Sequence, residues 1–206
     1  MKRFGFVLVS CMIAAALPSS ALALDPRYPD WPCVQAKVPE LSVATMWDGP
    51  AIADVGNSWR DDSKIRDLVP RLAARRTPLD AAQKAIAEFM ADGSETEKQS
   101  KGTKLFAGLF DTLSQERAEV INGIERVSRN EKDLGEKIRS DVTTLHQLED
   151  KPDGDQTKVT ELANQVEWST RIFEDRRKTI RYVCEVPTTI EQRLFALARA
   201  IRQNMD

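Results

Sequence analysis

The sequence predicts an all-α protein: a long antiparallel helical hairpin, with two shorter helices packed at its base and a proline-rich N-terminal coil. Two observations support this fold class. Apolar residues between position 103 and about position 150 recur at alternating steps of three and four, a coiled-coil-like heptad pattern held for about six repeats. The same spacing returns after the turn "DKPDGD" at 150–155. A short turn favours pairing of the two segments within one chain, and pairing between two chains is the alternative.

The first element, residues 1–23, has the pattern of a secretory signal peptide. A basic start is followed by an apolar run, Phe4–Leu17, and by the small-residue sequence Ala21–Ala23, after which signal peptidase cuts. The apolar run is too short for a comfortable membrane span. We therefore expect an exported protein of a bacterial periplasm. The minor alternative is a lipoprotein anchored at Cys11, because Leu8–Cys11 resembles a lipoprotein cleavage box.

Two cysteines, Cys33 and Cys184, remain after removal of this leader. An even number of cysteines in an exported protein predicts a disulfide, and only one pairing is open within the chain. The two positions are so far apart that the bond would close almost the whole mature chain into one loop. The alternatives are a bond between two chains and a redox-active pair, although the chain has no Cys-x-x-Cys spacing and no histidine beside either cysteine.

Residues 24–60 form a Pro/Trp-rich extended segment. Prolines and glycines interrupt every periodic run here, so we expect coil with at most one short turn of helix. Trp31, Trp47 and Trp59 all lie in this segment, and a coil of this length stays ordered only if their rings pack onto another element. The rings either cover the helices or, in a second interpretation, form the edge of a partner or ligand surface.

Residues 61–92 predict a pair of short helices. In the first, apolar residues follow helical spacing around Pro70, which should kink the helix or divide it. The second begins with Thr77 as a cap and Pro78 in its first turn, and it ends at the glycine that opens the next segment. That segment, "GSETEKQSKG" at 93–102, is polar and bounded by glycines, which predicts a linker.

Residues 103–206 form the predicted hairpin. Its outgoing helix of about 45 residues would be ~70 Å long, and Pro187 kinks the returning helix. Most seam positions are apolar. One charged seam position, Glu131, is expected to pair with Arg176 of the returning helix and to fix the register at some cost in stability. A capping box, Thr188–Glu191, is expected to restart the helix after the proline.

Composition argues against several functional classes. The chain after residue 23 carries a net charge of about −4 with both signs mixed along it, whereas nucleic-acid binding needs a clustered basic face. His146 is the only histidine, so we expect no metal site, no cofactor and no histidine-activated nucleophile. A small basic patch formed by Arg71, Arg75 and Arg76 is either a solvated helix end or a surface for a partner.

These observations favour an exported, non-catalytic protein that acts through protein–protein contact. It would be an accessory, scaffold or chaperone-like factor, monomeric or homodimeric, with a protein partner in the cell envelope. The first alternative is a helical small-ligand-binding module, in which the helical base and the tryptophan-bearing coil enclose a pocket. The second is a carboxylate-based hydrolase of the cell wall or a polysaccharide. The three tryptophans and three arginines named above are the candidate partner or ligand surface.

Overall fold

The computed structural model describes residues 25–151 and 155–205, so the signal peptide predicted for residues 1–23 lies outside the described residues. The regular elements of the described part are helices, which confirms the all-α fold class. In chain order they are α1 (Val43–Met46), the 3-10 helix η1 (Ser58–Asp61), α2 (Ser63–Ala73), α3 (Leu79–Met90), α4 (Glu95–Glu149), α5 (Gln156–Val183) and α6 (Val186–Gln203).

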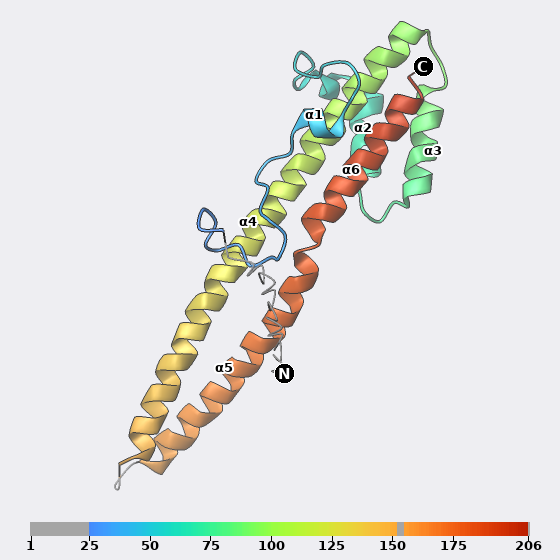
Figure 1. Cartoon of the computed structure of the whole chain (residues 1–206). Coiled ribbons are helices and arrows are strands. Elements are labelled where there is room, and N and C mark those ends of the chain that lie inside the picture. The colour runs from blue at the N-terminus through green and yellow to red at the C-terminus, as the bar shows by residue number, and fades with distance from the viewer. Residues whose placement is uncertain (1–24, 152–154, 206) are drawn as a thin grey trace, which may run out of the picture.

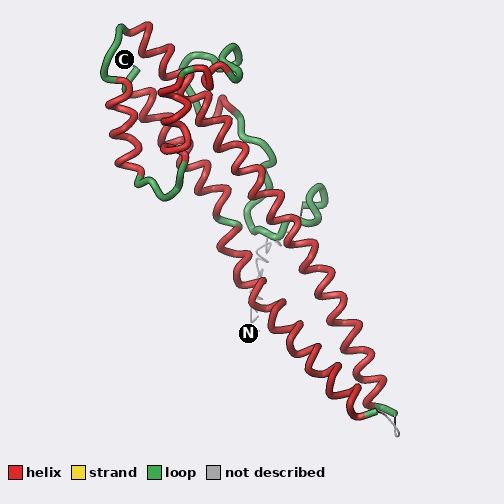
Figure 2. Tube along the Cα trace, turned by 180° about the vertical axis from the view of Figure 1, so that it is seen from behind, coloured by secondary structure: helices red, strands yellow, loops and turns green. Residues whose placement is uncertain are grey.

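The molecule is elongated and is built along one helix (Figure 1). α4 has 55 residues, so it is ~80 Å long at about 1.5 Å per residue. α5 and α6 run back along α4, and α2 and α3 lie beside the half of the molecule where α4 begins (Figure 1). In the view from behind, α5 is the described helix that runs beside the distal half of α4 (Figure 2). We call residues 95–117 together with α2, α3 and α6 the head, and residues 118–149 together with α5 the stalk.

The head contains the main hydrophobic core, to which all four of its helices contribute. Trp47 stacks on Phe106 with the ring centroids 4.3 Å apart, which brings the N-terminal segment into this core. The backbone of α4 approaches the C-terminus closely at Gly102, where an added Cβ would lie 2.8 Å from Met205. The largest fully buried side chains are Phe106, Ile65, Leu72, Ile86, Met90, Leu105, Leu109, Leu113, Ile124, Ile190, Leu194 and Leu197.

The long helix begins at Glu95 rather than at position 103, so the linker predicted for 93–102 is wrong beyond Ser94. Ser94 and Glu97 form a capping box: the Ser94 backbone N–H donates to Glu97 Oε2 at 2.8 Å, and the Glu97 N–H donates to Ser94 Oγ at 3.4 Å. The preceding glycine has φ 120°, a conformation that suits glycine and turns the chain into the helix. Local capping therefore starts a helix in a segment whose composition alone indicates a loop.

Pro70 lies inside α2 and does not divide it. The helix is secured at its start by Asp62, whose carboxylate accepts two backbone N–H groups. The carbonyl group that loses its hydrogen bond is that of Arg66, and both Arg66 and Pro70 are exposed residues. At the next helix Pro78 is the N-cap. The cap predicted at Thr77 is wrong, because its hydroxyl donates instead to Arg71 O, at 2.8 Å.

The returning helix is divided into α5 and α6, and Pro187 lies in the first turn of α6, where its missing N–H has no helical partner to lose. The capping box predicted for Thr188 and Glu191 is wrong, because Glu191 reaches across to α4 and accepts a 2.7 Å hydrogen bond from Arg117. Arg117 is only 3% exposed and also donates to Pro39 O at 3.3 Å. This buried guanidinium joins α4, α6 and the N-terminal segment.

Polar contacts between α4 and α5 show the antiparallel register of the stalk. Arg176 Nη1 lies 3.2 Å from Glu131 Oε1. Nearer the turn, Gln165 Nε2 donates to Asp141 Oδ2 at 3.1 Å. Moving outward along α4 therefore corresponds to moving backward along α5, as an antiparallel pair requires.

Candidate interaction site on the helical stalk

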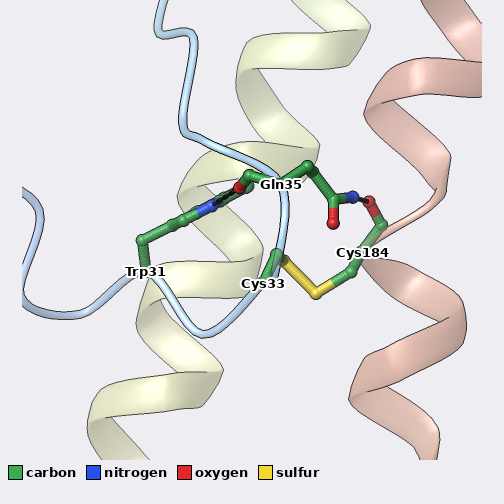
Figure 3. The surroundings of a disulfide bond; sticks show 4 residues. All are labelled: Trp31, Cys33, Gln35 and Cys184. Atoms are coloured by element: carbon green, nitrogen blue, oxygen red, sulfur yellow. Dashed lines mark hydrogen bonds between the residues drawn. A yellow bond between two sulfur atoms is a disulfide. The ribbon is translucent and has the colours of Figure 1, made fainter. Parts of the chain in front are cut away.

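A disulfide joins the N-terminal segment to the end of α5. Cys33 and Cys184, paired as expected from the sequence, are bonded and buried, with their Cα atoms 5.6 Å apart. Two hydrogen bonds hold the same place: the Trp31 indole N–H donates to Gln35 O at 2.7 Å, and the Gln35 side-chain amide donates to Cys184 O (Figure 3). We call these four residues the junction.

Ion pairs attach the N-terminal segment to α4 beside the junction. Lys37 Nζ lies 2.6 Å from Glu125 Oε1, and both side chains are mostly buried. Asp30 accepts hydrogen bonds from Lys132 at 2.8 Å and from Arg129 at 3.3 Å. The hydrogen bond from Lys132 is the main cause that lowers the pKa of Asp30, and the bond from Arg129 adds to it. The segment is thus held against one side of the stalk.

α5 is the least buried of the long helices. None of its 28 residues is buried, whereas α6 buries seven of its 18. Four large apolar side chains of the stalk are well exposed: Val127 by 41%, Trp168 by 61%, Tyr182 by 76% and Val183 by 37%. Burial of apolar surface is favourable, so a partner that covers these side chains would gain binding free energy.

One hollow of about 490 Å³ lies between α4 and α5 and is mostly apolar. Ile124 and Ile180, one from each helix, both contribute to it. Gly123 keeps it open, because an added Cβ there would meet only the side chain of Arg126, at 4.0 Å. We call this hollow the apolar groove. Its lining residues are Val120, Gly123, Ile124, Arg126, Val127, Asp175, Arg176, Thr179, Ile180 and Val183.

A second hollow, of about 500 Å³, lies on the side of the seam that faces the N-terminal segment. Four basic and two acidic side chains line it, a net charge of +2. Glu131 is 8% exposed; its Oε1 pairs with Arg176, while its Oε2 is enclosed and accepts no hydrogen bond from any described residue. We call this hollow the basic groove. Its lining residues are Pro32, Val34, Ser128, Glu131, Lys132, Gly135, Glu136, Arg139, Phe173, Arg177, Ile180 and Arg181.

The three tryptophans do not form a partner surface. Trp31, Trp47 and Trp59 are 7%, 7% and 5% exposed. Trp47 and Trp59 belong to the head core, and Trp31 packs in a smaller cluster around the disulfide. The partner-surface interpretation of these residues is therefore wrong, because each ring is used to hold the N-terminal segment onto the helices.

The basic patch of α2 lies elsewhere in the molecule. Arg71, Arg75 and Arg76 are exposed in and just after α2, in the head, and Arg75 Nε lies 3.4 Å from Glu116 Oε1. None of the three lines either groove. Of the arginines that do line the grooves, the sequence singled out Arg176 as the partner of Glu131, and the others were missed. The available signal was the four-residue spacing within "EDRRKTIR", which puts two arginines on one face of α5. The groove arginines are Arg126, Arg139, Arg176, Arg177 and Arg181.

Within residues 25–151 and 155–205, no cluster of three or more histidine, cysteine or acidic side chains is arranged to hold a metal ion. His146 is exposed near the stalk tip. The carboxyl groups with a shifted pKa in the same ranges all have it lowered, mainly by hydrogen bonds, whereas an acid catalyst needs a raised pKa. They are Asp25, Asp30, Glu97 and Asp155.

In residues 25–151 and 155–205, no helix is both long enough and apolar enough to span a membrane.

The sequence matches no protein-family model, and no curated protein or solved structure matches it either. The function is therefore inferred from the geometry and chemistry of the two grooves.

Proposed function

We propose that this chain is an exported, non-catalytic helical protein of the bacterial periplasm, which binds a protein partner through the apolar groove of its coiled-coil-like stalk. The signal-peptide pattern of residues 1–23 supports export. The disulfide between Cys33 and Cys184 supports it independently, because disulfides persist in oxidising compartments. An accessory, scaffold or chaperone-like role of this kind requires no cofactor.

The observation that carries the proposal is the uncovered apolar surface along α4 and α5. Val127 and Val183 line the groove and remain 41% and 37% exposed. A groove between two helices with half-exposed heptad residues can bind a third, amphipathic helix. That helix inserts its apolar side chains at positions i, i+3 or i+4, and i+7 into the groove. Burying each valine fully would contribute about 1 kcal/mol.

Charge on the groove lining restricts the partner further. Three charged residues line the groove: Arg176 and Asp175 pair within the chain with Glu131 and Lys178, whereas Arg126 forms no ion pair among the described residues. We therefore infer that the partner helix carries acidic residues beside its apolar stripe. Rim charges of opposite sign mainly set orientation and association rate, so the apolar contact supplies most of the affinity.

The test is site-specific photo-crosslinking in the periplasm of the source organism. A photoreactive residue at Val127 should crosslink to one partner, and the same residue at Thr143, exposed on α4 nearer the tip, is the matched control. The variant Val183→Glu should abolish the crosslink, because an unpaired carboxylate in the apolar contact lowers affinity at least ~100-fold. Both valines are partly exposed, so circular dichroism and the melting temperature should be unchanged.

Several outcomes are informative. A crosslink to a second copy of the chain would make the protein a homodimer through this groove. Equal crosslinking from positions 127 and 143, or a crosslink that survives Val183→Glu, would contradict the groove as the binding surface.

Among the alternatives, the ligand-binding module is favoured by one observation, the basic groove, whereas a pocket built from the tryptophan rings has no support because those rings are buried. The lowered carboxyl pKa values give no support to a hydrolase.

A further inference from the structure

We propose that the basic groove binds a small zwitterionic amphiphile. The ligand carries an oxyanion, phosphate or carboxylate, together with an ammonium group and a short apolar body. This groove shares only Ile180 with the apolar groove, so the inference does not depend on the proposed function.

The oxyanion is recognised by guanidinium groups that have no ion-pair partner among the described residues, although Glu136 also lines the groove. Arg139, Arg177 and Arg181 line the groove from α4 and α5, and no carboxylate of the described residues lies within ion-pair distance of any of them. Arg177 instead lies over the ring of Phe173, 5.6 Å from its centroid. The fourth cation, Lys132, is already bonded within the chain. Guanidinium groups bind phosphate and carboxylate through paired, charge-assisted hydrogen bonds, so this set fits an oxyanion.

The ammonium group is recognised by the buried carboxylate. Glu131 Oε1 accepts a hydrogen bond from Arg176, whereas Oε2 has no donor among the described residues. An enclosed acceptor without a partner is unfavourable, and the terminal torsion of a glutamate is soft. A turn of the carboxylate therefore presents this oxygen to the groove, where a ligand ammonium with three N–H donors satisfies it.

The apolar body of the ligand fits the remaining wall. Phe173 and Ile180 come from α5, while Pro32 and Val34 come from the N-terminal segment. Val34 is 80% exposed, so a ligand would cover apolar surface that is otherwise in water. The volume of about 500 Å³ lies within the range of small-molecule sites and limits the apolar body to a short chain or side chain.

The test is isothermal titration calorimetry on the oxidised protein purified from the periplasm of an expression host. Two zwitterionic probes distinguish the sources of the shared chemistry: hexanoyl lysophosphatidylethanolamine, used below its critical micelle concentration, and the peptide trileucine. Hexyl phosphate is the probe without an ammonium group. The variants are Glu131→Gln and the double change Arg177→Gln with Arg181→Gln. Arg171→Gln is the matched control, since Arg171 lies on α5 outside the groove and pairs with Glu167 at 3.0 Å.

We expect one of the two zwitterionic probes to bind in a 1:1 ratio. Binding of the lipid would indicate a phospholipid as the natural ligand, and binding of trileucine would indicate a peptide. The double arginine variant should weaken its binding at least ~10-fold. Glu131→Gln, which keeps an oxygen for Arg176, should weaken the zwitterion about 10-fold without weakening hexyl phosphate. Arg171→Gln should change neither. Any of three results would overturn the proposal. Neither zwitterion binds, or binding persists in the double arginine variant, or Glu131→Gln weakens the binding of the zwitterion and of hexyl phosphate equally. Unchanged melting curves for the variants exclude misfolding as the cause.

Discussion

Removal of the disulfide tests how much of the stability depends on the junction. The perturbation is the double variant Cys33→Ser with Cys184→Ser. The bond spans a sequence separation of 151 residues. In the chain-entropy model, a closed loop of this size stabilises the folded state by about 5 kcal/mol at 25 °C, because it restricts the unfolded chain. Such a loss is comparable with the whole stability of many domains, which is about 5–15 kcal/mol.

The variant should nevertheless fold. The head core does not include either cysteine, and the N-terminal segment keeps the ion pairs of Asp30 and Lys37 with α4. For a chain of this length about 1 kcal/mol corresponds to about 2–4 °C, so the melting temperature should fall by about 10–20 °C. The helical signal at low temperature should be retained.

The assay is urea unfolding followed by circular dichroism, in the oxidised and the reduced state. Reduction should lower the midpoint of the wild-type protein to that of the variant and leave the variant unchanged, which serves as the internal control. A wild-type protein whose free energy of unfolding changes by less than about 1 kcal/mol on reduction would refute the loop-closure reasoning. In that case the segment would contribute no long-range constraint.

Three further changes test the packing. Gly108→Ala should destabilise the head by about 1–3 kcal/mol in urea titrations, because the added Cβ would lie 2.8 Å from a side chain of α2. Gly123→Ala, where only one flexible side chain comes within 4.0 Å, should instead stabilise the stalk helix by about 0.5–1 kcal/mol. Arg117→Ala should cost about 2–3 kcal/mol in the same assay, less than a fully buried pair, because the Glu191 side chain is 30% exposed; a double variant that also removes Glu191 should cost less than the sum. The pKa of Asp30 is lowered in the folded protein. Its contribution to the free energy of unfolding is therefore present above its ordinary pKa of 3.8 and is lost as the pH falls through the lower, folded-state pKa. The difference in urea midpoint between wild type and Asp30→Asn should therefore be present at about pH 5 and should shrink as the pH is lowered below 3.8.

Local sequence patterns predicted the elements that they encode directly. The heptad spacing on both sides of the turn at 150–155 specifies two amphipathic helices, and their antiparallel pairing follows from the shortness of that turn. The ion pair between Glu131 and Arg176 lies where the seam alignment put it. The disulfide followed from counting the cysteines that remain in a chain whose sequence predicts export.

Features that depend on tertiary contact were missed. The first turns of α4 are polar in sequence, and the burial of Thr103 and the close approach of Gly102 to Met205 show that this part of the helix has a packed face. The capping box at Thr188 was plausible locally, but Glu191 has a stronger charged partner in Arg117, far away in the sequence. The two grooves could not be predicted either, because a hollow depends on which side-chain volumes fail to meet across a seam.

The position of the junction relates the formation of the disulfide to the formation of the basic groove. It lies where the packing changes, at the end of α5, which has no buried residue, and before α6, which is packed into the head. The N-terminal segment covers one side of the stalk, where it supplies Pro32 and Val34 to the basic groove. These two residues flank Cys33, so the disulfide fixes the wall that they form, together with the ion pairs of Asp30 and Lys37 on either side. Since such a bond forms in an oxidising compartment, the wall of the basic groove would be fixed after the export that we propose, whereas the apolar groove needs only the pairing of α4 with α5.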